Sequence, residues 1–182
     1  MGCYGPYPAA GQNCSGYLVE DEAAVVLLDC GSGVLSRLRH FVEPWELNAV
    51  ILTHLHSDHM ADVLIIRYAL LIKRLQEAGL PLLVYAPAQP KEEFSRLAYK
   101  NVVQSKPLSS NTTLTIGTMR FTFTPAVHAI TAYMITVESG GKKLVYSGDT
   151  EYFPRMHGFF HRELGLFYYA KSVGSRAGSR RF

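Results

Sequence analysis

Short, largely apolar runs separated by polar turns mark the predicted β-strands of this chain. Residues 25–28 and 47–53 form such runs, which are typical of strands buried on both faces. Residues 120–124 alternate polar and apolar side chains, as expected of a strand with one buried face. The polar residues that follow these runs are therefore expected at strand ends, where a sheet presents its loops.

Helical periodicity appears between the strand-like runs. Residues 61–78 are long enough and apolar enough to predict a helix, which Gly79 would end. Residues 91–100 predict a shorter helix with a mixed, solvated face, and residues 100–110 predict a loop. Strands and helices thus follow one another along the chain, and polar clusters fall on the connections between them.

The densest polar cluster follows the predicted strand at 47–53. It contains His54, His56, Asp58 and His59, in a chain with seven histidines overall. Imidazole nitrogens and carboxylate oxygens suit a borderline divalent ion such as zinc. A polar loop or a surface histidine tract is the alternative, but it does not explain the position on a strand-to-helix connection, where open α/β sheets bind ligands. The cluster therefore predicts a metal site.

The spacing inside the cluster suggests two ions. His54 and His56 are two residues apart and project to the same side of an extended chain, whereas Asp58 and His59 lie where the chain turns into a helix. Two ions need more ligands than these four residues provide. Further histidines or aspartates are therefore expected on other apolar-flanked turns.

Three residues at predicted strand ends are candidates for that role, namely Asp29, His128 and Asp149. Each also has an ordinary explanation. The two aspartates could bond nearby turn amides, and His128 could be a half-buried histidine with satisfied hydrogen bonds. Their recurrence at strand ends favours the metal-site interpretation.

The order of these motifs resembles the metallo-β-lactamase superfamily. The matching residues are Asp29, then His54-x-His56-x-Asp58-His59, then His128, then Ser147-Gly148-Asp149-Thr150, and the similarity runs from residue 13 to residue 150. The resemblance implies an α/β (α+β) fold, a four-layer αβ/βα sandwich with a dinuclear metal site along one edge. The second half of that sandwich is expected to be incomplete here.

The resemblance also implies a role for each candidate residue. His54, His56 and His128 would bind the first metal, Asp58 and His59 the second, and Asp149 would bridge them. Asp58 and Asp149 are the expected catalytic residues. Asp29 would support the site through hydrogen bonds rather than bind metal. Two zinc ions are expected, with manganese and iron as alternatives.

Within the superfamily, the stretch Tyr146-Ser147-Gly148-Asp149-Thr150 looks most like ribonuclease Z and neighbouring small bacterial hydrolases. That similarity implies a metal-dependent hydrolase that uses a metal-bridging hydroxide on phosphodiesters, either small molecules or nucleic acids. An inactive metal-binding fragment, and a hydrolase of carboxylic esters, lactones or thioesters, remain alternatives.

Cysteine usage and hydropathy add little to this interpretation. Cys3, Cys14 and Cys30 are an odd number without metal-site spacing, and Cys30 beside Asp29 is expected to be a small buried residue rather than a nucleophile. No signal peptide or membrane-spanning segment is evident. We therefore expect a cytoplasmic protein without a membrane partner, and a second copy of the chain is a candidate partner.

The C-terminal part differs most from the superfamily pattern. Residues 1–170 are expected to form one hydrolase domain, and residues 171–182 a basic, disordered tail. The tail carries four basic residues and no acidic one, and without it the chain has 14 basic against 15 acidic residues. Charge therefore does not indicate a nucleic-acid substrate. Neither His157 nor His161 resembles the superfamily's last second-metal ligand, so a truncated chain is expected.

Overall fold

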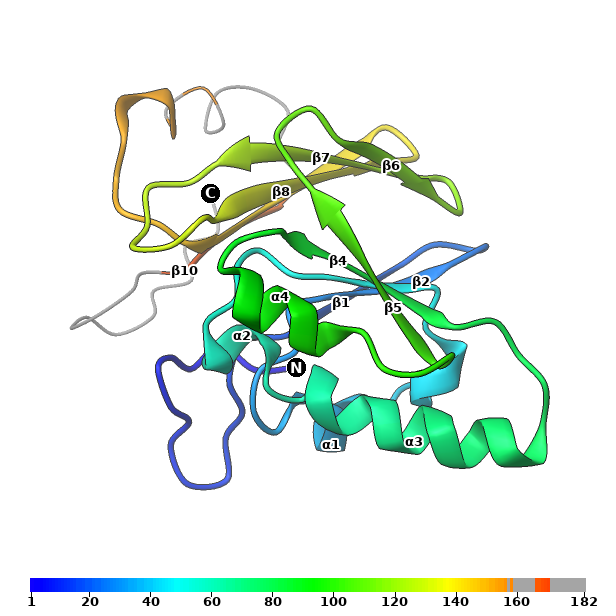
Figure 1. Cartoon of the computed structure of the whole chain (residues 1–182). Helices are drawn as coiled ribbons and strands as arrows, with labels where there is room; N and C mark the ends of the chain where they lie inside the picture. The colour runs from blue at the N-terminus through cyan, green and yellow to red at the C-terminus, as the bar shows by residue number, and fades with distance from the viewer. Residues whose placement is uncertain (157, 159–165, 171–182) are drawn as a thin grey trace.

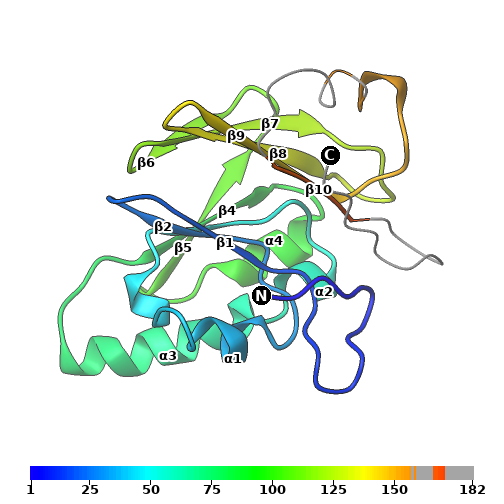
Figure 2. The same cartoon turned by 180° about the vertical axis from the view of Figure 1, so that it is seen from behind.

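Two β-sheets packed face to face form the framework of the protein, and helices cover the outer face of the first sheet (Figure 1). The view from behind shows the same layers (Figure 2). The computed structural model describes residues 1–156, 158 and 166–170. The described residues form one layer of helices and two layers of β-sheet, in agreement with the predicted α/β class.

The first sheet has the strand order β1-β2-β3-β4-β5. Strands β1 and β2 are antiparallel, and β2, β3, β4 and β5 run parallel to one another. The carboxyl ends of the parallel strands therefore lie at one edge of the sheet. The strands are β1 (Tyr17–Glu20), β2 (Val25–Leu28), β3 (Ala49–Ile51), β4 (Leu82–Pro87) and β5 (Val103–Leu108).

Strand β5 corrects the expectation of a loop over residues 100–110. Its sequence, VQSKPL, is mostly polar and contains Pro107, so no strand pattern is visible in it. It forms because each of its residues pairs with β4, from Val103 opposite Leu82 to Leu108 opposite Pro87. As the last strand of the described sheet it tolerates a proline, which cannot donate to a further neighbour.

The helices on the outer face of the first sheet differ from the prediction in one boundary. The predicted helix at 61–78 is a 14-residue helix, α3, preceded by a separate short helix, α2. Asp62 lies between them, and its carboxylate accepts a hydrogen bond from the Leu35 amide at 2.8 Å. The helical elements are α1 (Val34–Leu38), the 3₁₀ turn η1 (Pro44–Glu46), α2 (Ser57–Met60), α3 (Val63–Gln76) and α4 (Lys91–Leu97).

The second sheet has the order β10-β9-β8-β7-β6. Strands β6 to β9 are antiparallel neighbours, whereas β10 pairs parallel to β9. The elements are β6 (Thr113–Ile116), β7 (Met119–Pro125), β8 (Tyr133–Ser139), β9 (Lys142–Asp149), the 3₁₀ turn η2 (Pro154–Met156) and β10 (Leu166–Ala170). His157, His161 and the predicted tail at 171–182 lie outside the described residues.

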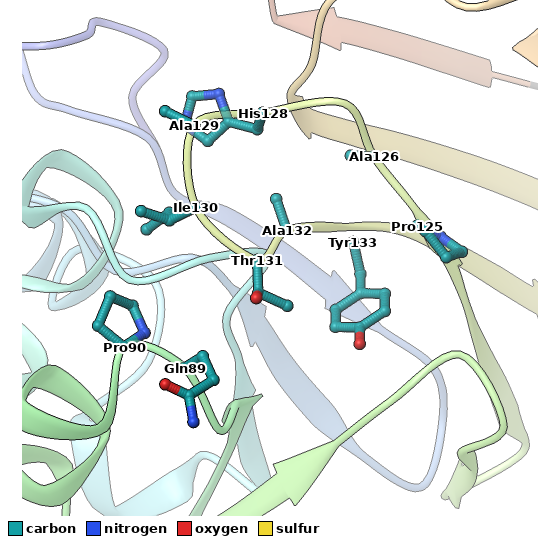
Figure 3. A pocket seen from close by; sticks show the side chains of 10 residues that line it. All are labelled: Gln89, Pro90, Pro125, Ala126, His128, Ala129, Ile130, Thr131, Ala132 and Tyr133. Carbon is teal, nitrogen blue, oxygen red and sulfur yellow. The ribbon is translucent and has the colours of Figure 1, made fainter.

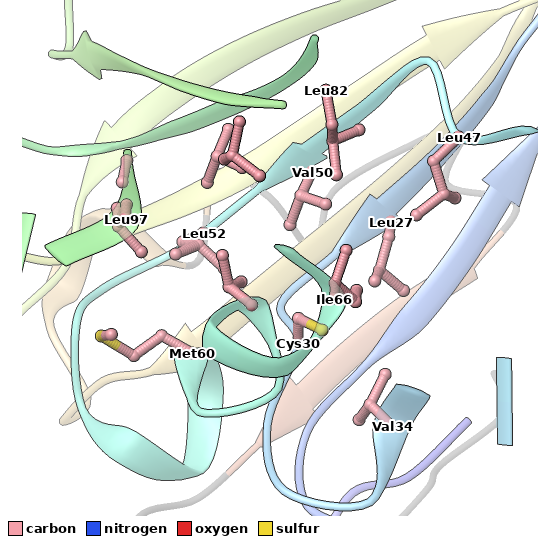
Figure 4. Close-up of a cluster of buried hydrophobic side chains, with 14 of the residues drawn as sticks. Leu27, Cys30, Val34, Leu47, Val50, Leu52, Met60, Ile66, Leu82 and Leu97 are labelled. Atoms are coloured by element: carbon pink, nitrogen blue, oxygen red, sulfur yellow. The ribbon is translucent and has the colours of Figure 1, made fainter. Parts of the chain in front are cut away.

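Alternate side chains of the first sheet enter two different cores, which explains its continuous apolar runs. Leu27, Val50 and Leu52 pack with Ile66 of α3 under the helices (Figure 4). The neighbouring side chains of β2 and β3 point into the core between the sheets, against residues such as Phe121 of β7. No helix in the described part is both long and apolar enough to cross a membrane.

Candidate metal centre

The sequence-predicted site residues come together at one edge of the sandwich. Asp29 directly follows β2, and His54 lies shortly after β3, so the parallel pairing of these strands places both at the same sheet edge. The second sheet contributes His128, from the connection between β7 and β8, and Asp149, the last residue of β9. Backbone bonds join the two sheets here, since the Tyr133 amide donates to the Thr53 carbonyl at 3.0 Å.

Three imidazole nitrogens converge on one point of this edge. His54 Nε2 lies 3.1 Å from His56 Nδ1, and His128 Nε2 lies 3.0 Å from the same atom. The rings stand nearly edge to face, at centroid distances of 4.7–4.8 Å, so their nitrogens rather than their faces meet. A neutral His56 could donate its single N–H to one of these two nitrogens at a time, whereas a metal ion would accept lone pairs from all three. The arrangement fits a single metal ion.

A second group of donors adjoins the first and shares His54 with it. One ligand atom each from His54, His59 and Asp149 lies within 4.8 Å of the others. The Nε2 atom of His59 lies 3.4 Å from Asp149 Oδ1 and 3.6 Å from Asp58 Oδ2. That nitrogen is buried and has no hydrogen-bond partner in the described part of the chain. A buried polar atom without a partner is costly unless another group binds it.

Asp29 occupies the centre of a buried hydrogen-bond network behind these ligands. Its Oδ1 accepts from the Thr53 amide at 2.7 Å, and its Oδ2 accepts from His59 Nδ1 and from the Tyr146 hydroxyl, both at 2.6 Å. The carboxylate is fully buried, so these donors replace the water that would otherwise solvate it. Because His59 Nδ1 donates to Asp29, its Nε2 faces the metal-binding side.

Thr53 extends this network to His54. Its hydroxyl lies 2.9 Å and 3.1 Å from the two Asp29 oxygens, which only accept, so the hydroxyl hydrogen points to Asp29. The hydroxyl oxygen is then an acceptor for His54 Nδ1, 3.0 Å away. His54 consequently carries its proton on Nδ1, and the lone pair on Nε2 faces the other two histidines. Asp29 thus orients His59 directly and His54 through Thr53.

Burial keeps two of the first group's imidazoles neutral. It lowers the pKa of His54 far below the ordinary value, and positive charge on His59, His128 or His56 would lower that pKa further. Burial also lowers the pKa of His128, by more than the Asp149 carboxylate raises it. Since only a neutral imidazole nitrogen can bind a metal ion, both residues are ready to do so at neutral pH.

His59, in the second group, instead favours positive charge. Burial alone would lower the pKa of His59, but the carboxylates of Asp29 and Asp149 outweigh it and raise that pKa to about 10. Burial would likewise raise the pKa of Asp149, but the neighbouring His59 outweighs it and lowers that pKa. The surroundings of His59 Nε2 therefore stabilise a cation, which a metal ion can supply in place of the proton.

The donor set fits divalent metal ions of the zinc type. It offers imidazole nitrogens and carboxylate oxygens, which are the ligands such ions prefer. A cation would satisfy both the His59 Nε2 atom, which has no hydrogen-bond partner among the described residues, and the three converging nitrogens. The expected residues are thus close together, although Asp58 approaches the site only through its 3.6 Å contact with His59.

Close backbone packing fixes the loop that carries the cluster. A Cβ on Gly31 would collide with the carbonyl of Asp58, so only glycine fits beneath α2. The Cys30 amide donates to the His59 carbonyl at 2.7 Å. Cys30 itself is fully buried, and burial raises the pKa of its thiol well above the ordinary value. It is therefore a packing residue, as expected, and not a nucleophile.

Sequence reasoning missed two contributors to the site, Thr53 and Tyr146. Thr53 was visible only as the last residue of a predicted strand, although a hydroxyl directly before a histidine cluster was a usable signal. In the sequence, Tyr146 has the appearance of an apolar strand residue. The structure buries it to 1% exposure, and a buried tyrosine hydroxyl needs a hydrogen-bond partner, which here is Asp29.

A family comparison agrees with this geometry. Residues 25–167 match the model of the beta-lactamase superfamily domain. The chain therefore belongs to the metallo-β-lactamase superfamily of metallo-hydrolases, and it has the superfamily's fold and a cluster of histidines and aspartates suited to metal.

Individual relatives place it more narrowly. The chain is 35% identical to the probable metallo-hydrolase YhfI of Bacillus subtilis over 84% of its own length and 63% of that protein. It is 27% identical to ribonuclease Z of Methanopyrus kandleri, covering 91% of this chain and 58% of the relative. The chain thus spans about three fifths of the length of these relatives.

Solved structures give the same picture. The crystal structure of YhfI from Bacillus subtilis superposes with a TM-score of 0.85 at 33% identity, covering 92% of this chain and 67% of that one. The short form of human tRNase Z superposes with a TM-score of 0.71 at 18% identity, covering 92% and 74% of the two chains, which shows a shared fold.

Proposed function

We propose that this chain is the metal-binding, catalytic part of a hydrolase that cleaves phosphodiesters. The observation that carries the proposal is the buried, unpartnered His59 Nε2 between Asp58 and Asp149, beside three converging histidine nitrogens. Two relatives support the phosphodiester assignment by their names. They are the ribonuclease Z given above and the mouse zinc phosphodiesterase ELAC protein 2, which is 31% identical over 69% of this chain.

The proposal gives each ligand a place. His54, His56 and His128 would hold a first zinc ion, Asp58 and His59 would hold a second, and Asp149 would contribute its carboxylate to both. Divalent ions bound here would supply an activated water and would neutralise charge on the substrate's phosphoryl oxygens. The remaining chemistry belongs to the side chains.

Asp58 and Asp149 are the proton-handling groups in this proposal. Their carboxylates are partly accessible, at 9% and 16% exposure, whereas Asp29 is sealed from solvent. When the water oxygen bonds to phosphorus, a carboxylate can take its proton and pass it to the departing ester oxygen as the phosphorus–oxygen bond breaks. Asp29 and Thr53 meanwhile hold His59 and His54 in the orientation that the metal needs.

Metal content and turnover of the full chain together test the proposal. We expect close to two zinc ions per chain by elemental analysis, and hydrolysis of bis-p-nitrophenyl phosphate in preference to the carboxylic ester p-nitrophenyl acetate. About one ion and no turnover would overturn the hydrolase and leave a metal-binding protein. Preference for the acetate would show that the substrate class is a carboxylic ester and not a phosphodiester.

Two histidine-to-alanine substitutions, one at a proposed ligand and one at an exposed residue, provide the matched variants for that test. His56→Ala removes a ligand, and we expect it to abolish turnover and lower the zinc content. His40→Ala removes an exposed histidine that follows α1, and we expect it to change neither. Turnover that survives in His56→Ala would overturn the assignment of the site.

A further inference from the structure

A pocket of about 530 Å³ lies beside the metal centre, between the β4–α4 connection and the β7–β8 connection (Figure 3). Gln89 and Pro90 form one wall, and His128 lies at the opposite end of the β7–β8 loop (Figure 3). A volume of this size is typical of sites that bind small molecules.

Two independent observations place the pocket next to the metal centre. His128 belongs to both, since it lines the pocket and its Nε2 lies 3.0 Å from His56 Nδ1. In addition, β4 is the parallel neighbour of β3, so Gln89 emerges at the sheet edge where His54 emerges. A ligand in the pocket therefore lies one strand away from the metal-binding loop.

Backbone hydrogen bonds hold the β7–β8 loop, which forms one wall of the pocket. The Ala126 amide donates to the Ala132 carbonyl at 3.0 Å, which closes the His128 loop at its base. The Glu151 amide donates to the Val127 carbonyl at 2.7 Å, and the Val127 amide donates to the Thr150 hydroxyl at 3.0 Å. These hydrogen bonds order that wall before a ligand arrives, which reduces the entropy cost of binding.

The chemistry of the lining residues is neutral. Apart from His128, no residue that lines the pocket carries a titratable charge at neutral pH. Gln89, Thr131 and Tyr133 offer an amide and two hydroxyls, and among the described residues none of these three side chains has a hydrogen-bond partner. The other lining residues are apolar: Pro90, Pro125, Ala126, Ala129, Ile130 and Ala132.

We propose that this pocket binds an uncharged, partly apolar substituent of a small phosphodiester, of the size and polarity of a nucleoside or aryl alcohol. The proposal rests on the proposed function for its phosphodiester part. Apolar walls would contact the faces of a ring, and the free amide and hydroxyls would pair with its polar edge. Because the pocket carries no lysine or arginine, it does not suit the phosphates of a nucleic-acid strand.

Binding can be measured without any turnover. We expect uridine, added to the metal-free full chain, to shift the backbone amide signals of Ala129 and Ala132 and the side-chain amide of Gln89 in ¹⁵N-correlated NMR spectra. Inorganic pyrophosphate, the charged probe, should leave these signals in place. Absence of saturable uridine shifts at the pocket, or equal shifts with pyrophosphate, would overturn the proposal.

Kinetics then connect the pocket to the reaction. Thr131→Trp fills the pocket from an exposed position, and Val127→Trp places the same ring on the same loop at a residue that does not line it. We expect wild-type protein and Val127→Trp to prefer thymidine 5′-p-nitrophenyl phosphate over methyl p-nitrophenyl phosphate. Thr131→Trp should reduce that preference in kcat/KM about tenfold, a loss of about 1.4 kcal/mol in transition-state stabilisation.

The two experiments separate the two proposals. An unchanged preference in Thr131→Trp would overturn the pocket while leaving the hydrolase intact. Hydrolysis of neither substrate would overturn the proposed function, and the uridine titration would then decide by itself whether the pocket binds neutral rings.

Discussion

At the scale of single residues, Asp29 shows how a buried carboxylate orients the proposed metal ligands through hydrogen bonds. It is fully buried and binds no metal in our assignment, yet it contacts the proposed metal ligand His59 directly and reaches the ligand His54 through Thr53. Hydrogen bonds of this kind fix which imidazole nitrogen carries the proton and which faces the metal. Removal of one link should therefore affect metal binding without removing a ligand.

Thr53 offers a clean test of that idea. Thr53→Val keeps the shape of the side chain but loses the hydroxyl between Asp29 and His54, and we expect zinc affinity to fall about ten- to hundredfold. Thr53→Ser keeps the hydroxyl and should stay near the wild-type affinity. Chelator competition at fixed pH measures both. Equal affinities in the valine and serine variants would contradict the relay from Asp29 to His54.

Tyr146 contributes stability through the same carboxylate. Tyr146→Phe removes the hydroxyl that donates to Asp29 at 2.6 Å in a fully buried setting. Because the hydrogen bond is made to a charged group, we expect the free energy of unfolding to fall by about 1.5–3 kcal/mol. Urea unfolding of metal-free protein measures this loss. Tyr7→Phe, at a residue with 76% exposure, should leave stability unchanged.

The close approach of β9 to the metal-binding loop is the decisive feature at the scale of elements. Gly148 in β9 has a φ of 55°, and a Cβ there would lie 2.8 Å from the Thr53 side chain. The same strand ends in Asp149, so the contact also sets how far that carboxylate reaches into the site. A larger residue would push the two sheets apart at this edge.

Gly140 and Gly148 have nearly the same φ, so alanine substitutions at the two positions test that contact. Gly140 has a φ of 54° but nothing within 4 Å of its Cβ position, so Gly140→Ala incurs only the backbone strain. Gly148→Ala incurs that strain and the overlap with Thr53. We expect it to lose about 1–3 kcal/mol more of unfolding free energy, together with zinc affinity. Equal losses in the two variants would show that the strand approach does not matter.

At the scale of the whole molecule, a polar contact joins the two sheets far from the metal centre. Asp21 lies in the β1–β2 turn and Thr118 in the β6–β7 turn, and the carboxylate accepts from the Thr118 amide and hydroxyl, both at 2.7 Å. These hydrogen bonds, first that of the Thr118 hydroxyl and then that of the Ala23 amide, lower the pKa of Asp21 to about 2.

That lowered pKa gives a pH-dependent prediction. The pKa in the folded protein lies below the ordinary 3.8, so the contribution of the carboxylate is full above that pH and is lost as the pH falls towards 2. Asp21→Asn should therefore melt below wild type at pH 6, and the gap should close as the pH falls through 2. Glu22→Gln, in the same turn, should show no such convergence. Thermal melts followed by circular dichroism measure both.

Much of the site was predictable because its chemistry is local in sequence. His54, His56, Asp58 and His59 fall on one strand-to-helix connection, and the runs that bury both faces of β2 and β3 are contiguous. The helix boundaries around Asp62 and the existence of β5 were not predictable. The break between α2 and α3 depends on a contact with Leu35, and β5 exists only through pairing with β4.

The sequence by itself determined the kind of donor and the strands that carry them, since ligand type, spacing and two-faced burial are all properties of neighbouring residues. Only the tertiary structure decided which atoms meet. It brought His128 against His56 across 72 positions of chain and left His59 Nε2 without a hydrogen-bond partner among the described residues. It also made Asp29 the common acceptor for Thr53, His59 and Tyr146, because sheet pairing, not sequence distance, sets which strand ends are neighbours.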